Sequence, residues 1–327
     1  MKNDLHFLIL AFLIFVITAF KGYCQEIPSS KVTPPTVQEL VKKMMDYRKS
    51  VNNGKIIVKV KWIKNPDINY QGAEGIFRFY FKPDCLRKDS IFQFQTGQMV
   101  MQYVKTPIHA FWRSGGGKDF PCQYTDDVNF LKSHNDVPPT SLMALGTCPC
   151  GISTYDSLDL NHLELCPLEG RNFQIVYDKA NNMDTWKVTY QIGDELANRK
   201  NSYWVIPQMG YSMIRFESEQ SYSNGDTIAI HYTLQAKQFN NIWFPKEIHY
   251  QLEENGKITH EEIQTINEAK FNQSLDDKEF ALEKLEIPQG TEVAVNGKLL
   301  KYWNGEKLSD YPSYPLPKND KMTTQRR

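Results

Sequence analysis

Hydrophobic and polar residues alternate along most of this chain, and a period of two is typical of β-strands with one buried face. In the first half, "KIIVKVKWI" begins the alternation at Lys55, and "GIFRFYF" and "QMVMQYV" repeat it. In the second half, the pattern returns in "NFQIVYD" and "TWKVTYQI" and continues through "TIAIHYTLQA". The pattern predicts about 11 to 12 strands in two series.

The segments between these runs are typical of tight hairpin turns. In "NSYWVIPQMGYSMIRFESEQ", residues 201–220, two strand-like runs flank Pro207-Gln208-Met209-Gly210, where Pro fixes φ and Gly tolerates a positive φ. Further turns are expected at Asn224-Gly225, Asn240-Asn241 and Asn255-Gly256, about fifteen residues apart. Long antiparallel strands twist, so we expect this meander to curl or close.

One amphipathic helix precedes the strands. Thr36 and Glu39 have the spacing of a capping box, and "TVQELVKKMMDYRKSV" places apolar residues at i, i+3, i+4 and i+7. Such a stripe could bind a membrane, but a stripe of this width is more typical of packing on the protein's own sheet. We therefore expect the helix to lie against one side of the sheet.

The pattern divides the chain into one domain with flanking segments. We predict a linker at residues 25–35, a single domain at residues 36–310, and a disordered tail at residues 311–327. Inside the domain, residues 136–170 lack a period of two, and their Pro, Cys and Leu residues predict an insertion of short helices and loops. The expected fold class is therefore α+β: a long antiparallel β-meander that packs over the N-terminal helix and the mid-chain helical insertion.

The N-terminus has the features of a signal peptide. Lys2 precedes the apolar run "LHFLILAFLIFVITAF", and its length of about 16 residues is short for a membrane span of roughly 20. We expect cleavage after Cys24, so that residues 1–24 are the signal peptide. A membrane anchor and a lipidated Cys24 are the alternatives, although Tyr23 is bulky where a lipidation signal needs a small residue. The protein is expected to be exported to the periplasm, with outer-membrane association or secretion as alternatives.

Cysteines of an exported protein are expected to pair. The chain has 6 Cys, and without Cys24 the number is odd, so at least one cysteine stays unpaired or forms an intermolecular bond. Only Pro149 separates Cys148 and Cys150, a poor geometry for a bond between them, so each is expected to pair with a distant cysteine. The disulfide candidates are Cys122, Cys148, Cys150 and Cys166. A metal site is not expected, because the Cys-x-Cys stretch lacks the second ligand pair of a tetrahedral zinc site.

Charge and motifs argue against several functional classes. The chain has 38 basic and 38 acidic residues, which removes the electrostatic argument for nucleic acid. The glycines of "RSGGGKDF" lack P-loop spacing, and no G-x-S-x-G signature marks a nucleophile. The acid pairs Asp126-Asp127, Glu253-Glu254, Glu261-Glu262 and Asp276-Asp277 are expected to be solvated, because neighbours on a strand face opposite sides. We expect neither an enzyme nor a cofactor.

The remaining signal is a set of Met, aromatic and Ile residues on the strands. Such side chains suit a concave lining that adapts to flexible acyl chains. The alternative is that the helix simply fills the concave side. The predicted lining residues are Met99, Met101, Tyr103, Trp186, Tyr190, Tyr211, Met213, Ile228, Ile230 and Tyr232.

Several strand motifs are similar to those of a known family. "WVIPQMGYSMIRFE" is similar to a recurring W-V-D-P-x-x-G-Y strand-turn-strand, with Ile206 in place of Asp, and "NIWFPKEIHY" and "FALEKLEIPQGTEV" are similar too. With the signal peptide, capped helix and mid-chain insertion, the layout resembles the LolA/LolB-type outer-membrane lipoprotein carriers, best over residues 173–290. The resemblance implies an incomplete β-barrel wrapped over helices, with an apolar cavity for acyl chains.

Residues and resemblance together predict an exported, non-enzymatic protein that binds a lipid or the acyl chains of a lipoprotein. Other envelope proteins are further expected partners. One alternative is an envelope scaffold or interaction module whose concave face is packed solid. Another is a secreted hydrolase with a catalytic group in residues 136–170.

Overall fold

The computed structural model describes residues 33–310, apart from 69, 116–121, 128, 130, 132–172, 181 and 194–196. The chain divides into Met1–Pro35 and a larger unit, Thr36–Arg327, to which the sheet and its helix belong. The predicted signal peptide, the insertion at 136–170 and the tail at 311–327 lie outside the described residues.

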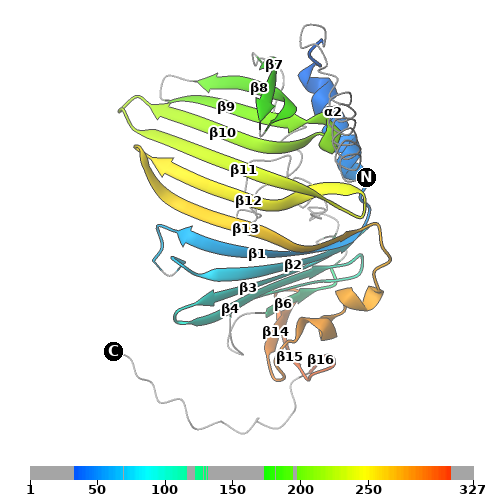
Figure 1. Cartoon of the computed structure of the whole chain (residues 1–327). Helices are drawn as coiled ribbons and strands as arrows, with labels where there is room; N and C mark the ends of the chain where they lie inside the picture. Colours follow the sequence, from blue (N-terminus) through cyan, green and yellow to red (C-terminus); the bar gives the residue numbers. More distant parts are fainter. Residues whose placement is uncertain are drawn as a thin grey trace, which may run out of the picture. The chain divides into compact units, whose positions relative to one another are not determined.

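Sixteen strands form one sheet, which makes up most of the larger unit (Figure 1). The strands are β1 (Gly54–Lys64), β2 (Glu74–Lys82), β3 (Cys85–Phe94), β4 (Gly97–Lys105), β5 (Ala110–Ser114), β6 (Cys122–Thr125), β7 (Phe173–Ala180), β8 (Met183–Gly193), β9 (Ala197–Ile206), β10 (Ser212–Tyr222), β11 (Thr227–Phe239), β12 (Ile242–Glu254), β13 (Lys257–Phe271), β14 (Glu292–Val295), β15 (Leu299–Trp303) and β16 (Leu308–Ser309). In the part of the chain that the structure describes, the helices with given bounds are α2 (Val37–Lys49) and the short 3-10 turns η2 (Pro207–Met209), η3 (Asp277–Phe280) and η4 (Leu282–Leu285).

Most strands pair with their neighbours in the chain, with two exceptions. β1 pairs with β13 in antiparallel fashion, which joins the first series of strands to the second. β6 pairs with β14 in parallel. The order is therefore β16-β15-β14-β6-β5-β4-β3-β2-β1-β13-β12-β11-β10-β9-β8-β7.

The expected fold class is wrong. The structure is mainly one sheet that stays unclosed, with β7 and β16 at its two ends, rather than an α+β incomplete barrel of about 11 to 12 strands wrapped over helices. The number of strands was underestimated because β6, β14, β15 and β16 have only 4, 4, 5 and 2 residues. Segments this short cannot display a period of two.

The helix α2 begins where the capping box predicts. The Thr36 N–H donates to Glu39 Oε2 at 2.8 Å, and the Glu39 N–H donates to Thr36 Oγ1 at 3.2 Å. Leu40 and Met44 are buried on the side of α2 that faces the sheet, and Leu40 packs with Trp186 of β8. The apolar stripe of this helix therefore contacts the protein's own strands.

The sheet has two faces that differ in polarity. Residues opposite each other in an antiparallel ladder point to the same side. Val58 of β1 lies opposite Phe77 of β2 and Ile266 of β13, all three buried. We call this side, which α2 contacts, the apolar face. The alternating residues, such as the exposed Lys59 and Lys61, lie on the opposite face.

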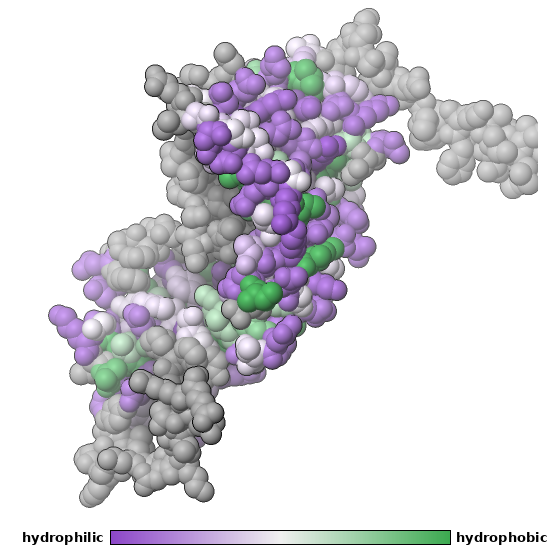
Figure 2. Space-filling view, turned by 90° about the vertical axis from the view of Figure 1, so that its left-hand side faces the viewer, coloured by the Kyte–Doolittle hydropathy of each residue, from purple (hydrophilic) through white to green (hydrophobic). Residues whose placement is uncertain are grey.

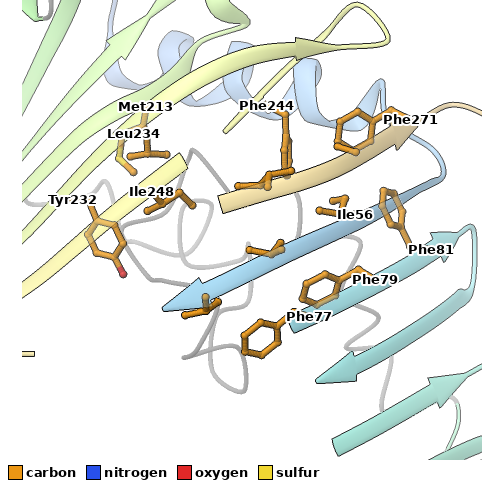
Figure 3. Close-up of a cluster of buried hydrophobic side chains, with 14 of the residues drawn as sticks. Ile56, Phe77, Phe79, Phe81, Met213, Tyr232, Leu234, Phe244, Ile248 and Phe271 are labelled. Atoms are coloured by element: carbon orange, nitrogen blue, oxygen red, sulfur yellow. The ribbon is translucent and has the colours of Figure 1, made fainter. Parts of the chain in front are cut away.

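Each face carries a core. The main core lies on the apolar face of β1, β2 and β10–β13 and includes Phe79, Phe81 and Phe244 (Figure 3). The second core lies on the opposite face, where the chain after β13 folds back so that Phe280 and Leu285 pack with Cys85, Val104, Phe111, Cys122, Val293 and Trp303. The surface in Figure 2 is largely hydrophilic, with hydrophobic residues scattered over it, which is ordinary for a protein surface.

The predicted turns are confirmed. Pro207–Met209 forms the turn η2, and Gly210 follows with φ 64°. Asn255-Gly256 and Asn240-Asn241 also have positive φ values at their hairpin ends. Two constraints favour glycine at residue 210: its positive φ, and the close approach of Tyr47 of α2, whose ring would lie 2.2 Å from an added Cβ.

No disulfide is found among the described residues, so the predicted pairing of Cys122 is not confirmed. Cys85 and Cys122 are both buried thiols in the second core. Strand β6 places Cys122 opposite Arg113 of β5, so its partner in the ladder is an arginine. The other candidates, Cys148, Cys150 and Cys166, lie outside the described residues.

Burial should make both thiols unreactive in the folded protein. It raises the pKa of the Cys122 thiol to about 11 and raises the pKa of Cys85 as well. Because the thiolate is the reactive species, we expect iodoacetamide at pH 8 to modify neither cysteine until denaturant is added. Peptide mapping by mass spectrometry checks this. Rapid labelling of Cys122 in the native protein would contradict it.

Candidate ligand-binding face

Seven consecutive strands, β7 to β13, each place one aromatic ring in a single row across the apolar face. The centroids of successive rings are between 4.8 and 6.2 Å apart. Since neighbouring strands are about 4.8 Å apart, the row spans about 29 Å. This aromatic row consists of Phe173, Tyr190, Tyr203, Phe216, Tyr232, Tyr250 and His260.

Strand register aligns these rings. Phe216 of β10 lies opposite Tyr203 of β9 and Tyr232 of β11, and Tyr232 in turn lies opposite Tyr250 of β12. Cross-strand aromatic pairs stabilise a sheet by roughly 0.2–1 kcal/mol each. The row therefore helps to fix the register of the long meander, and it also creates a track of aromatic rings across the sheet.

Polar groups interrupt the track at two places. The hydroxyl groups of Tyr190 and Tyr203 lie 3.1 Å apart. At the β13 end, His260 Nε2 lies 3.3 Å from Glu262 Oε2, and Gln264 Nε2 donates to Glu262 Oε1 at 2.5 Å. Glu262 and Gln264 are 0% exposed, so a hydrogen-bonded carboxylate lies inside the apolar face.

The acid pair Glu261-Glu262 was expected to be solvated, and this is wrong for Glu262. The two side chains do point to opposite faces, as expected for a strand. Glu261 accepts a hydrogen bond from Gln251 at 3.0 Å and lies 2.8 Å from His249 Nε2. The contact with His249 lowers the pKa of Glu261. Because the carboxylates face apart, they cannot act on one substrate.

A second aromatic cluster extends the apolar face beyond β13. The ring of Trp62 on β1 lies 5.6 Å from Tyr70 and 5.7 Å from Phe92 of β3, and Phe92 lies 5.4 Å from Phe77 of β2. Trp62 is also the register partner of Glu262. The aromatic row and this cluster therefore meet at the buried carboxylate.

The predicted lining residues that lie in strands share the apolar face. Met213 lies opposite Val205, which lies opposite Trp186, and Ile230 lies opposite Leu252. Whether these side chains contact a ligand stays a prediction. Trp186, Tyr190, Met213 and Tyr232 are buried, Met99, Tyr103, Ile228 and Ile230 are half-buried, and Met101 is exposed.

Tyr211 is the predicted lining residue that lies outside a strand. It follows Gly210 in the hairpin and packs beside Leu40, Trp186 and Val188. Lys43 of α2 lies over its ring, with Nζ 5.2 Å from the centroid. Tyr211 therefore contacts the helix α2 and belongs to the cluster that also includes Phe173 and Tyr203 of the aromatic row.

The sequence prediction missed much of the aromatic row. Phe173, Tyr203, Phe216, Tyr250 and His260 were not among the lining residues. Alternation places each of them on a strand face, and that was the available signal. It does not say which strands pair or in which register, and only pairing brings the rings together.

The helix covers one end of the apolar face. Tyr47 of α2 accepts a hydrogen bond from the Trp243 N–H at 2.6 Å, at the start of β12. Ile228 and Ile230 lie toward the other end of β11, where Ile228 pairs with Glu254 at the end of β12 (Figure 1). Both isoleucines and Leu252 are half-buried, so this end of the face is the less covered one.

The opposite face carries a polar hollow of about 300 Å³. Arg215, Glu217, His231 and Gln251 are among its lining residues. Arg215 pairs with Glu217 and also lies over the ring of Trp204, 4.6 Å from the centroid. These charged side chains do not suit an acyl chain.

Within the described residues, no group of three or more His, Cys, Asp or Glu side chains could hold a metal ion. Among the described helices, none is both long and apolar enough to cross a membrane.

Comparisons with known proteins give structural likenesses only. No family model matches the chain, and no curated protein matches it. The structure is similar to a DUF1329 family protein from Desulfovibrio piger, with 9% identity and a TM-score of 0.37 over 78% of this chain and 100% of that one. It is also similar to the lipoprotein LppX of Mycobacterium tuberculosis, with 12% identity and a TM-score of 0.29 over 75% of this chain and 99% of that one. At such values neither likeness decides the function.

Proposed function

We propose that this protein is a carrier that holds acyl chains of a lipid or lipoprotein against the apolar face of its sheet. The observation that carries the proposal is the aromatic row, a track of ring side chains about 29 Å long whose middle, from Phe216 to Tyr250, is the most apolar part. A long acyl chain could lie along such a track. Each CH₂ group it buries contributes about 0.8 kcal/mol, so binding would need no salt bridge.

The less covered end of the apolar face is the proposed contact region. Ile228, Ile230 and Leu252 are half-buried there, and Tyr250 of the aromatic row is half-buried as well. At the other end, α2 already occupies the face through Leu40 and Tyr47. Displacement of α2 from the sheet would lengthen the exposed track, and this offers a route for loading and release.

In this role the protein would be a non-enzymatic lipid-binding protein of the cell envelope. The predicted signal peptide at residues 1–24 supports export. The separation of Glu261 from Glu262 by the sheet removes one candidate pair of catalytic carboxylates. A balanced charge of 38 basic and 38 acidic residues favours an apolar ligand over a polyanion.

A scaffold with a filled core is the second candidate function. Phe216 and Tyr232, in the middle of the aromatic row, are only 4% exposed each. If the whole apolar face is filled in this way, it serves stability alone.

Uptake of a fluorescent fatty-acid probe tests the carrier function. We expect the wild-type protein to take up the probe, and lipid to co-purify with it in native mass spectrometry. Ile230→Asp should weaken probe binding at least about tenfold, because the carboxylate would lose its hydration against the acyl chain.

The matched control is Thr233→Asp on the same strand. Thr233 is exposed on the opposite face, opposite Arg215, so this variant should bind the probe like wild type. Far-UV circular dichroism should be unchanged for both variants. Absence of probe uptake and of extractable lipid in the wild type would rule out the carrier and favour the scaffold.

A further inference from the structure

A buried arginine without a counter-charge lies on the opposite face, away from the aromatic row. Arg113 of β5 is only 7% exposed, and its Nε has no hydrogen-bond partner. Within the described part of the chain, Arg113 makes no ion pair with a carboxylate. A guanidinium stays charged at all relevant pH values, and an uncompensated buried charge is costly.

The neighbours of Arg113 in the sheet cannot neutralise it. Its register partners are Gln102 of β4, which is uncharged, and Cys122 of β6. Burial keeps Cys122 a neutral thiol by raising its pKa to about 11. The nearest carboxylate in this row of strands, Asp89 of β3, lies opposite Gln102.

Asp89 is already committed to another arginine. Arg87 donates to it through Nε at 3.0 Å and through Nη2 at 2.6 Å. Arg87 also donates to the carbonyl oxygens of Glu279 and Lys284. The two buried arginines on this face therefore differ: the guanidinium of Arg87 donates to a carboxylate and to two carbonyl oxygens, whereas Arg113 Nε has no acceptor.

Gln102 presents a second unsatisfied group beside Arg113. It is 8% exposed, and its Oε1 has no hydrogen-bond donor within reach, while its Nε2 lies 3.4 Å from Asp89 Oδ1. Directly opposite residues have Cβ atoms about 4.5–5.5 Å apart. A cationic donor and a neutral acceptor, both buried and both unsatisfied, therefore lie next to each other.

We propose that Arg113 and Gln102 bind a phosphate group that carries a proton, either the hydrogen phosphate ion or the monoanion of a phosphate monoester. The guanidinium donates to the charged oxygens of the phosphate, and Gln102 Oε1 accepts the hydrogen bond of its hydroxyl. Sulfate has the same shape and lacks that proton at neutral pH, so the acceptor discriminates against it. The site lies on the opposite face and does not depend on acyl-chain binding.

Thermal unfolding of the full chain at constant ionic strength and pH 7 tests this site. We expect the melting temperature to rise with the concentration of inorganic phosphate until the site is saturated. Sulfate should give the same rise only at concentrations at least tenfold higher. Glycerol 3-phosphate serves as the monoester, and the two phosphate ligands are also compared at pH 6, where a larger share of the monoester carries the proton. The stronger of the two phosphate ligands identifies the source of the group.

Three variants assign the effect to the two residues. Arg113→Met should abolish the rise with phosphate and, in phosphate-free buffer, should melt no lower than wild type because it removes a buried charge. Gln102→Leu should keep oxyanion binding but lose the preference for phosphate over sulfate. Arg215→Met, which alters an exposed arginine paired with Glu217, should keep the full response.

Three results would overturn the proposal. The first is the absence of a saturable rise in wild type with either phosphate ligand, and the second is an equal rise in Arg113→Met. The third is a clear loss of stability of Arg113→Met in phosphate-free buffer, because this would mean that the chain itself supplies the counter-charge.

Discussion

Asp89→Asn is expected to destabilise the protein by about 3–5 kcal/mol, since it removes the hydrogen-bonded counter-ion of a buried guanidinium. Asp89 is 1% exposed and Arg87 is 7% exposed, with Arg87 Nη2 2.6 Å from Asp89 Oδ2. After the substitution, the nearest carboxylate to Arg87 would be Glu279, at 3.6 Å. Arg87 also holds the backbone of the segment after β13, so the second core should loosen with it.

Chemical denaturation measures this effect against a matched control. Glu217→Gln removes the partner of Arg215, whose side chain is 48% exposed, and should cost no more than about 1 kcal/mol because exposed pairs contribute little. The double variant Arg87→Met with Asp89→Leu should lose less stability than the sum of the two single variants. An equal loss of unfolding free energy for Asp89→Asn and Glu217→Gln would show that the buried ion pair contributes no more to stability than the exposed one.

The parts of the fold that depend on local pattern could be predicted from the sequence. Alternation identified the long strands, the Asn-Gly and Pro-x-x-Gly segments identified hairpin turns, and Thr36 with Glu39 identified the helix start. The pairing of strands that are distant in sequence could not be predicted this way. The pairing of β1 with β13 and of β6 with β14 joins residues far apart in sequence, and no local rule encodes those contacts.

The same limit applies to the candidate sites. Alternation placed Ile230 and Tyr232 in "TIAIHYTLQA" on one face, and the register of the neighbouring strands agrees. It could not place Glu262 inside the apolar face, because a carboxylate is expected on the solvent side of a strand. The sequence pattern could not indicate a role for Arg113 for a related reason: a missing counter-charge is a property of three-dimensional neighbours.

The hairpin at Gly210 connects the sequence prediction to the packing of α2. Gly210 has φ 64°, and a Cβ at this position would lie 2.2 Å from Tyr47 Cζ and 2.3 Å from Tyr47 Cε1. The Tyr47 hydroxyl also accepts the hydrogen bond from the Trp243 N–H. Any side chain at residue 210 must therefore displace the ring that ties α2 to β12.

We expect Gly210→Ala to lower the free energy of unfolding by about 3–6 kcal/mol. This combines about 1–2 kcal/mol for an L-residue in the left-handed conformation with about 1–3 kcal/mol for overpacking and about 1 kcal/mol for the displaced hydrogen bond. Gly225→Ala is the control, because Gly225 has φ 91° and no atom within 4 Å of the added Cβ. That variant should lower the free energy of unfolding only by the conformational part, about 1–2 kcal/mol.

In a Tyr47→Ala background the ring is gone, so the two glycine variants should then lower the free energy of unfolding by the same amount, as measured by urea denaturation. A difference that persists without Tyr47 would place the origin of the strain in the hairpin itself rather than in the contact between α2 and the sheet.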